Sequence, residues 1–236
     1  MITVDFQRLG IRSGYRILDM GCGSGRHMGE AVCFADTEVF GADIHFSDLL
    51  QARQRLSDLE KIAYAKGKWH LAVADITRLP FPDNYFDLLI CSEVLEHIRD
   101  HRQAVREAVR VLKPGCSLVV SVPRCFPEQV CWFLSPAYRN TPGGHIRIYT
   151  RKKLQNLLEK EGLKTRARAW AHSLHTPYWW LKCLPGMENN NSFLLSLYHR
   201  FLVWDLMMHP KIPRFAEKLL NPLMGKSLVL YLEKIR

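Results

Sequence analysis

A glycine-rich turn that directly follows a short apolar run constrains this chain more than any other feature. In the stretch ILDMGCGSG, residues 17–25, the run contains Asp19, and Gly21, Gly23 and Gly25 then alternate with small residues. Such a turn lets the backbone come very close to a ligand, and a strand that passes through it into a helix is the first unit of a Rossmann-like sheet. The spacing G-x-G-x-G differs from the G-x-G-x-x-G loop of dinucleotide enzymes and from the Walker-type loop of nucleoside triphosphate enzymes.

Periodicity and turn residues predict a regular alternation of strands and helices. Strands are expected at residues 16–20, 38–42, 69–74, 88–91, 117–122, 163–170 and 226–234. Helices are expected at residues 26–35, 47–64, 102–112 and 150–161. Thr150 can cap the last of these helices and Gly162 can end it. The pattern predicts an α/β fold with a Rossmann-like, doubly wound sheet of seven strands, most of them parallel.

The residues at the ends of the predicted strands resemble the motifs of a known family. Asp43 ends the second strand about twenty residues after the glycine loop, where a carboxylate can accept hydrogen bonds from both hydroxyls of a ribose. Asp75 and Ile76 follow the third strand. The fourth strand lies within the stretch LPFPDNYFDLLICSEVLEHI, and the fifth lies within VLKPGCSLVVSVP. In this order the motifs resemble the class I S-adenosylmethionine-dependent methyltransferases, and in particular the ubiquinone/menaquinone-biosynthesis (type 11) small-molecule methyltransferases.

This resemblance implies an enzyme that binds S-adenosylmethionine and transfers its methyl group. It implies that Asp19 and the three glycines hold the methionine and ribose side, that Asp43 binds the ribose hydroxyls, and that Asp75 with its apolar neighbour contacts the adenine. Ser92, after the fourth strand, would shape the methionine end of the pocket. The complete set of expected cofactor-binding residues is Asp19, Gly21, Gly23, Gly25, Asp43, Ile44, Asp75, Ile76 and Ser92.

A substrate cap is expected from segments that the resemblance does not cover. The family normally carries lid helices before the first strand and joins its last two strands, an antiparallel pair, by a short link. Here only about fifteen residues precede the first strand, and residues 172–225 separate the last two. Within a single methyltransferase domain, residues 1–236, we therefore expect a helical, aromatic-rich cap inserted between strands six and seven, and residues 124–144 are a second candidate cap segment. The expected substrate-binding aromatics of the insertion are Tyr178, Trp179 and Trp180.

Two histidines are candidate catalytic bases. Methyl transfer from a sulfonium depends mainly on alignment, and a base is needed only when the acceptor is a hydroxyl or an acidic carbon. His97 follows the fourth strand, and His145 lies in the stretch PGGHIRIYT. If that stretch is extended, Arg147 and Tyr149 share a face with His145 and could line the acceptor site. A lone histidine is also common as a hydrogen-bonding scaffold residue, so both interpretations stay open.

A divalent metal is possible but not favoured. Glu93, Glu96 and His97 would share one face if their segment were helical, and two carboxylates with an imidazole can hold a metal. The pattern E-x-x-E-H resembles one that is associated with a metal in ubiquinone-pathway O-methyltransferases. Because E-H at this place also occurs in relatives that need no metal, the expectation is a site without one.

Basic residues concentrate in the C-terminal part of the chain. Residues 1–150 contain 18 Lys and Arg against 17 Asp and Glu, whereas residues 151–236 contain 15 against 6. A basic, aromatic-rich cap suits an anionic lipid surface or a phosphorylated lipophilic substrate, although a merely solvated basic face is the plain alternative. Nucleic acid is a less suitable partner, because the aromatics cluster in apolar company instead of alternating with Lys and Arg.

The remaining features favour a cytoplasmic protein, with a peripheral membrane contact left open. The chain shows no signal peptide and no uncharged apolar stretch long enough to span a bilayer. Its seven cysteines are scattered without a C-x-x-C pair, as expected for reduced core thiols. We therefore expect methyl transfer to a small lipophilic acceptor, with oxygen favoured over carbon. The alternatives are an RNA methyltransferase and a non-catalytic, cofactor-binding interaction protein.

Overall fold

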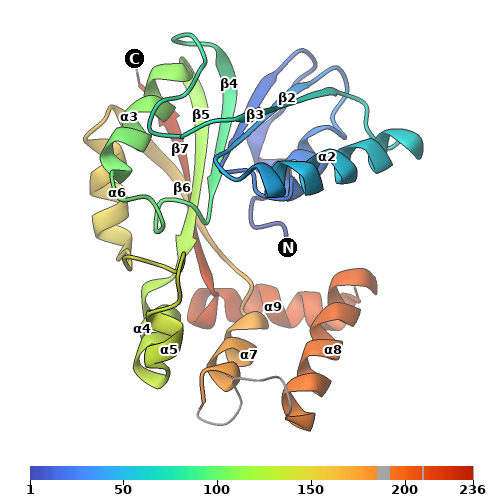
Figure 1. Ribbon diagram of the computed structural model, residues 1–236, viewed down its shortest axis with the longest axis vertical. Coiled ribbons are helices and arrows are strands. Elements are labelled where there is room, and N and C mark those ends of the chain that lie inside the picture. Colours follow the sequence, from blue (N-terminus) through green and yellow to red (C-terminus); the bar gives the residue numbers. More distant parts are fainter. Residues whose placement is uncertain (185–191, 209, 236) are drawn as a thin grey trace.

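The computed structural model describes residues 1–184, 192–208 and 210–235, and a seven-stranded sheet forms its centre (Figure 1). The strands are β1 Arg16–Met20, β2 Glu38–Asp43, β3 Lys68–Val73, β4 Phe86–Ser92, β5 Leu112–Pro123, β6 Leu163–Ala171 and β7 Ser227–Lys234. Their order across the sheet is β3-β2-β1-β4-β5-β7-β6. β7 pairs antiparallel with both of its neighbours, and the other described pairs are parallel. The predicted fold class is confirmed.

The helices of the described residues fall into two groups. A short 3-10 helix and four α-helices accompany the sheet: η1 Phe6–Leu9, α1 Arg26–Ala31, α2 Phe46–Lys61, α3 His101–Val111 and α6 Arg151–Glu159. Five others gather beyond the carboxyl ends of the parallel strands (Figure 1): α4 Cys125–Leu134, α5 Pro136–Arg139, α7 His175–Lys182, α8 Phe193–Met208 and α9 Lys211–Met224. We call these five the cap helices. Among the described helices none combines the length and the apolar content that crossing a bilayer requires.

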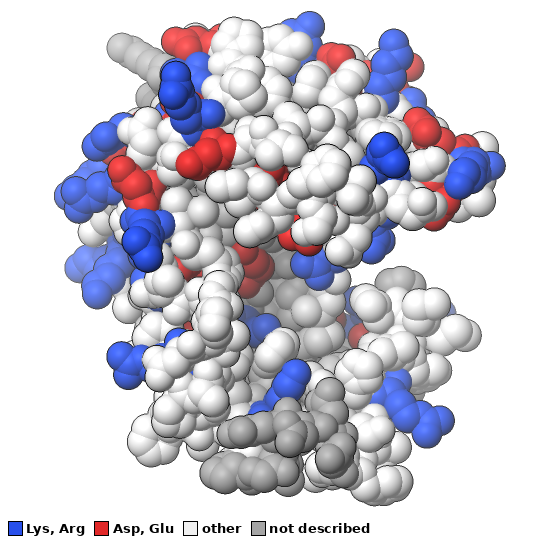
Figure 2. Space-filling model, viewed as in Figure 1, with Lys and Arg blue, Asp and Glu red and all other residues white. Residues whose placement is uncertain are grey.

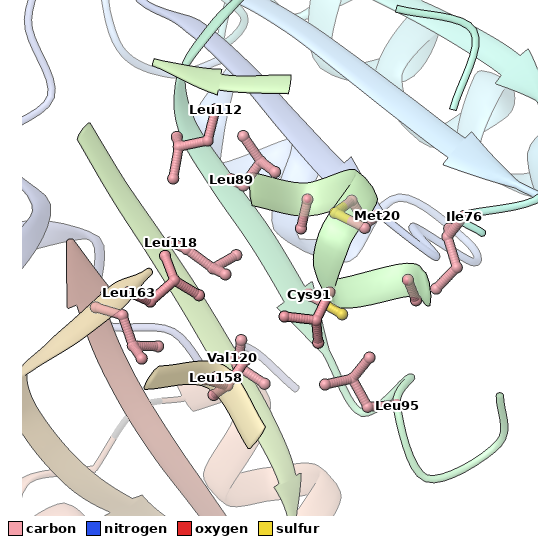
Figure 3. Close-up of a cluster of buried hydrophobic side chains, with 14 of the residues drawn as sticks. Met20, Ile76, Leu89, Cys91, Leu95, Leu112, Leu118, Val120, Leu158 and Leu163 are labelled. Atoms are coloured by element: carbon pink, nitrogen blue, oxygen red, sulfur yellow. The ribbon is translucent and has the colours of Figure 1, made fainter. Parts of the chain in front are cut away.

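Side chains of the central strands alternate between two hydrophobic cores. Leu18 and Leu89 belong to the core on one face of the sheet, whereas Ile17 and Leu88 belong to the core on the other face. Figure 3 shows the first core, in which the β4 and β5 side chains meet side chains of the neighbouring elements. Burial on both faces is typical of a doubly wound sheet and explains why the central strands β1, β4 and β7 are mostly apolar, whereas β3 and β6 at the two edges are not.

Two element boundaries differ from the sequence prediction by four residues or more. α1 ends at Ala31 instead of residue 35, because the hydroxyl of Thr37 donates to the carbonyl oxygens of Ala31 (3.2 Å) and Phe34 (3.0 Å) and the chain turns there. β5 begins at Leu112 instead of residue 117, because Leu112 already pairs with Phe86 before an irregular stretch of the strand. Neither difference moves the residues at the carboxyl edge of the sheet.

The cap insertion leaves and rejoins the sheet at one point. Ala171 of β6 and Ser227 of β7 are cross-strand partners, so the intervening chain begins and ends side by side. The backbone N–H of Ser173 donates to the side chain of Asn221 (3.0 Å), which ties the start of the insertion to α9. A helical insertion between strands six and seven is therefore present as predicted. Residues 185–191 and 209 of the expected cap segment 172–225 lie outside the described residues.

Candidate functional site

The glycine loop between β1 and α1 has a left-handed backbone at each of its alternating glycines. The φ angles of Gly21, Gly23 and Gly25 are 71°, 50° and 71°. A β-carbon on Gly21 would lie 2.6 Å from a methyl group of Val94, and one on Gly25 would lie 2.9 Å from the β-carbon of Ala52. A β-carbon on Gly23 would meet no described atom within 4 Å. The two outer glycines therefore allow close packing, and the middle one faces open space that a ligand can occupy.

Asp43 connects the glycine loop to the end of β2. Its Oδ2 accepts a hydrogen bond from the backbone N–H of Gly23 (2.8 Å), and its Oδ1 accepts one from the backbone N–H of His45 (2.9 Å). The residue is 8% exposed. Each carboxylate oxygen can accept a second hydrogen bond, so the fixed carboxylate still has acceptor capacity for ribose hydroxyls.

Asp19 lies under the loop as a buried carboxyl group. It is 2% exposed, and its Oδ2 has no hydrogen-bond partner among the described residues. Burial, and then the nearby carboxylate of Asp43, raises the pKa of Asp19 to about 7. A buried polar atom without a partner is costly, and a polar or cationic ligand group above the loop would satisfy it. This unpartnered oxygen and the open space at Gly23 fit S-adenosylmethionine, the cofactor that the sequence predicts.

The expected adenine side needs one correction. Asp75 is exposed, and its Oδ1 accepts hydrogen bonds from both the backbone and the hydroxyl of Thr77, each at 2.8 Å. Ile44 is 60% exposed beside Asp43. Ile76 is only 4% exposed and lies in the hydrophobic core shown in Figure 3, so its side chain is unsuited to direct adenine contact. Of the two predicted isoleucines, Ile44 is the one available to a ring.

Ser92 and Glu93 form a hydrogen-bonded group with the neighbouring strand. The Ser92 hydroxyl lies 2.7 Å from the hydroxyl of Ser121, which donates to Oε1 of Glu93 at 2.8 Å. Glu93 has a positive φ of 57°, and the segment after it is a turn instead of a helix. The helical face that would join Glu93 to Glu96 and His97 is therefore absent, and this part of the sequence interpretation is wrong.

Glu96 and His97 instead meet His145. Side-chain ligand atoms of these three residues all lie within 4.8 Å of one another, and the two histidine rings are 4.9 Å apart between centroids. Glu96 is fully buried, and neither carboxyl oxygen has a hydrogen-bond partner among the described residues. Burial, followed by the nearby Glu93, raises the pKa of Glu96 well above its usual range. Burial also lowers the pKa of His97, and the neighbouring His145 adds to this. The two candidate bases thus lie together.

Glu128 of α4 is absent from the residues that the sequence predicts, yet it contacts His145 directly. Its Oε1 lies 2.5 Å from Nδ1 of His145 and also accepts a hydrogen bond from Nε1 of Trp132 (3.1 Å). The hydroxyl of Tyr138 donates to its other oxygen at 3.4 Å. Glu128 is 3% exposed, and it is the single acidic residue within residues 124–144. That isolation in an apolar, aromatic segment is the sequence signal that could have identified it.

Arg147 and Tyr149 are engaged elsewhere than predicted. The guanidinium of Arg147 donates to the carbonyl oxygens of Leu95 (2.7 Å), Ile98 and Arg99 (3.0 Å). Tyr149 is 5% exposed, lies in the core, and its hydroxyl is 2.5 Å from Nδ1 of His101. The prediction that both line the acceptor site therefore needs correction. Their polar groups hold the turn that carries Glu96 and His97.

A cavity of 440 Å³ lies between the cap helices and His145. Its lining residues come from α5, α7 and the loops next to them: Ser135, Ala137, Tyr138, Thr141, Gly144, His145, Trp179, Lys182 and Cys183. Besides this cavity, the visible face of the molecule is hollowed between the part that carries the sheet and the part that carries α7 to α9 (Figure 2). The cavity is partly aromatic and has an imidazole at its edge, which suits an apolar molecule with one ionisable group.

The three aromatics of α7 do three different things. Trp179 lines the cavity, and the ammonium group of Lys226 lies 4.2 Å from the centroid of its ring. Trp180 donates from Nε1 to the carbonyl oxygen of Pro127 (3.1 Å) and so joins α7 to α4. Tyr178 stacks on Tyr198 of α8 at 6.3 Å between centroids. Of the predicted substrate aromatics, only Trp179 faces the cavity, and the other two hold the cap helices together.

Lys226, directly before β7, is a second residue that the sequence does not identify. Burial lowers its pKa, while the carboxylates of Glu93 and Glu128 act in the opposite direction. The ammonium group therefore lies near the ends of β4 and β5 as well as near α4. Lys226 meets these acidic neighbours only through folding, because Glu128 and Glu93 are about 100 and 130 residues away from it in the chain.

Comparison with known proteins places the relatives of this chain among methyltransferases. A family model described as a methyltransferase domain matches residues 18–120. The chain is 40% identical over 207 residues to the ubiquinone/menaquinone biosynthesis C-methyltransferase UbiE of Vibrio cholerae, covering 85% of this chain and 72% of that protein. It is 31% identical over 144 residues to the sterol 24-C-methyltransferase erg6 of Aspergillus fumigatus, covering 60% of this chain and 34% of that protein. A putative methyltransferase from Bacillus halodurans has the same fold, with a TM-score of 0.64 at 17% identity over 98% of this chain and 96% of its own.

Proposed function

The chain belongs to the class I S-adenosylmethionine-dependent methyltransferases of the ubiquinone/menaquinone-biosynthesis type, and we propose that it methylates a small lipophilic acceptor bound under the cap helices. The 440 Å³ cavity beside His145 is the observation that carries this proposal. A cavity of this size is typical of small-molecule sites, which are concave, largely apolar and supplied with a few polar groups. Quinone and sterol precursors, the substrates that the relatives' names suggest, have this chemistry.

The carboxyl edge of the sheet supplies the cofactor side of the proposed site. Asp19, Asp43 and the glycine loop would hold the methionine and ribose parts, with Ile44 and Asp75 at the adenine. S-adenosylmethionine, when bound, supplies an electrophilic methyl group on a sulfonium sulfur. The task of the protein is then to bring the acceptor atom into line with that methyl group and to exclude water.

We assign His145 the role of base and Glu128 that of a positioning residue. The contact between Glu128 and Nδ1 of His145 leaves Nε2 as the ring nitrogen that can take a proton from the acceptor. The buried carboxylate fixes the ring orientation and stabilises the imidazolium that results. The Lys226 ammonium group next to Trp179 would stabilise negative charge that develops on the acceptor.

The acceptor atom is then one that loses a proton, either a hydroxyl oxygen or the carbon that such an ionisation activates. Oxygen is the expectation from the sequence. Both relatives named above are C-methyltransferases, which favours carbon for this chain. The same base serves both outcomes, and the ¹³C chemical shift of the transferred methyl group in the product separates an O-methyl from a C-methyl.

Turnover in this proposal does not depend on a metal. Glu96, His97 and His145 are close enough to share a divalent ion, but Nε2, the one ring nitrogen of His145 that Glu128 leaves free, is the atom to which we assign the proton. We expect activity to persist after treatment with a chelator. Loss of activity that a divalent ion restores would move the assignment of these residues from base to ligand.

The proposal is tested in two steps with the full-length chain. Calorimetry should detect binding of S-adenosylmethionine and of S-adenosylhomocysteine with micromolar dissociation constants. Incubation with a lipid extract and methyl-labelled cofactor should then transfer label to an organic-soluble product, with bulk RNA as the negative control. If the chain binds the cofactor but labels no lipid, the proposed class of acceptor is wrong. If it labels RNA, RNA is the acceptor instead.

A further inference from the structure

Helix α9 presents its apolar face outward and its polar face to the protein. Ile212, Phe215, Leu219 and Leu223 follow the spacing of one helix face and are 82%, 71%, 66% and 71% exposed. Glu217, on the opposite side, is only 9% exposed. In a surface helix of a globular protein the apolar stripe normally faces the core, so this reversed orientation indicates a partner on the outer side.

Polar contacts fix α9 in this orientation. Asn221 accepts a hydrogen bond from the backbone of Ser173, and the backbone carbonyl of Glu217 accepts one from the Ser173 hydroxyl at 3.1 Å. Arg214 pairs with both Asp205 of α8 and Glu217. Turning the apolar stripe inward would bury Ile212 and its neighbours, but it would move Arg214, Glu217 and Asn221 away from their partners and break these contacts. The exposed stripe is therefore part of the folded state.

The end of α8 that precedes α9 adds further exposed apolar side chains. Met207 and Met208 are 72% and 68% exposed, and Trp204 is 47% exposed. Large side chains of this kind insert readily among lipid tails, and a tryptophan favours the boundary between tails and headgroups. Together with the α9 stripe they form a set that we call the outer cap face: Trp204, Met207, Met208, Ile212, Phe215, Leu219 and Leu223.

The charges around the outer cap face are positive. Arg200, Lys211 and Lys218 are exposed on the two helices, whereas their acidic residues, Asp205 and Glu217, are 3% and 9% exposed. Within the described parts of α8 and α9, therefore, no carboxylate is exposed. Figure 2 shows the visible outer rim of this region as uncharged with a few basic side chains. Lys211 and Lys218 lie two turns apart beside the apolar stripe. From this position their long side chains can reach lipid phosphates.

We propose that the outer cap face docks on an anionic membrane surface, with α9 lying parallel to the bilayer. The proposal rests on the proposed function in one respect, because a lipophilic acceptor would enter the cap from that membrane. Charge complementarity favours lipid over a second copy of the chain. A two-fold interface through this face would bring Lys211 and Lys218 of both copies together without exposed acids to pair with them.

The test is flotation of the full-length chain with vesicles of phosphatidylglycerol and phosphatidylcholine, compared with vesicles of phosphatidylcholine alone. We expect the chain to float with the anionic vesicles. The variant Phe215→Ser/Leu219→Ser should lower the partition coefficient at least tenfold, and Lys211→Glu/Lys218→Glu should abolish the preference for anionic lipid. The matched control Ile62→Ser/Tyr64→Ser removes two side chains that are 69% and 60% exposed beyond α2 and should bind like the natural chain.

Each result has a defined meaning. Unchanged calorimetric binding of S-adenosylhomocysteine shows that every variant is folded, and it is independent of lipid. The proposal is overturned if the natural chain does not float with anionic vesicles. It is also overturned if the Phe215→Ser/Leu219→Ser variant binds the vesicles as well as the natural chain does. If light scattering shows that the natural chain is a dimer and that only the Phe215→Ser/Leu219→Ser variant is a monomer, the outer cap face serves self-association instead. If the chain floats but no lipid is methylated, the docking surface stands and the proposed acceptor class fails.

Discussion

At the scale of single residues, the carboxylate of Asp43 acts both on the fold and on the proposed site. It accepts hydrogen bonds from the backbone of Gly23 and His45, so it shapes the loop and the start of α2 before any ligand arrives. A site that is built in this way is already organised for the ribose, which lowers the entropy cost of binding.

We predict that Asp43→Asn weakens binding of S-adenosylmethionine by about 1–3 kcal/mol. The amide has one acceptor oxygen where the carboxylate has two, so it leaves one of the two backbone donors or the ribose unpaired. Calorimetry measures the effect, and Asp58→Asn on the exposed side of α2 is the matched control. Equal affinity of Asp43→Asn and the natural chain would remove Asp43 from the cofactor site.

Asp19 makes the stability of the ligand-free chain depend on pH. Its folded-state pKa is about 7 against an ordinary value of 3.8, so between these values the folded chain holds a proton that the unfolded chain has lost. The free energy of unfolding therefore falls as pH rises through this window, by up to about 4 kcal/mol from this group. Asp19→Asn should remove that contribution.

Urea unfolding at several pH values tests this prediction through the difference between the two proteins. The difference between the two proteins is needed because the buried His27 acts with the opposite sign. Burial, and then the charge of Arg26, lowers the pKa of His27 to about 4, so the free energy of unfolding falls as pH falls below 6.5. His27 is common to both proteins and cancels. If the stability difference between Asp19→Asn and the natural chain stays constant from pH 4 to pH 8, Asp19 does not titrate in this window.

The contact between Glu128 and His145 leads to a prediction about non-additive effects. His145→Ala should lower kcat by about 10²–10⁴-fold, the usual range for a general base, and Glu128→Gln should lower it less. Because Glu128 acts through His145, the double variant should be no slower than His145→Ala alone. Binding of S-adenosylmethionine should be unchanged in all three. If the losses in kcat of the two single variants multiply in the double variant, Glu128 acts independently of His145. The variant His199→Ala, on the exposed side of α8, is the control.

At the scale of helices and strands, local patterns predict most of the sheet and little of the cap site. The glycine loop and the apolar strands are local features, and the predicted elements at the carboxyl edge are present within a few residues. Glu128 meets His145, and Lys226 meets Trp179, only in the folded chain, and no local sequence pattern indicates either contact. The same holds for the corrections to Arg147 and Tyr149.

Substitutions of the two neighbouring tryptophans of α7 should have separate effects, one on binding of the acceptor and the other on the stability of the fold. Trp179→Ala enlarges the cavity and removes a wall, so we expect the KM for the acceptor to rise about tenfold while the affinity for the cofactor stays unchanged. Trp180→Phe loses the hydrogen bond to Pro127 and should lower the free energy of unfolding by about 1 kcal/mol without a change in KM. Steady-state kinetics and urea unfolding of both variants provide the measurements, and the reverse pattern would contradict the assignment of the cavity.

At the scale of the whole molecule, the chain consists of a sheet with its flanking helices and an insertion, residues 172–226, that carries α7 to α9 and is attached at a hairpin. Ala171 and Ser227 are cross-strand partners, so the insertion occupies the position of a β-turn. The two-residue turn Asn-Gly suits the twist of an antiparallel pair and could join these partners directly. A chain without the insertion can therefore keep all seven strands in register.

We predict that replacing residues 172–226 by Asn-Gly gives a folded protein that binds S-adenosylmethionine but neither methylates a lipophilic acceptor nor floats with anionic vesicles. The cofactor contacts of Asp43 and the glycine loop lie outside the replaced segment, whereas Trp179, Lys226 and the outer cap face lie within it. Circular dichroism and calorimetry establish folding and cofactor binding. Full turnover of the shortened chain would place the acceptor site elsewhere. A folded chain that no longer binds the cofactor would mean that the insertion also completes the cofactor site.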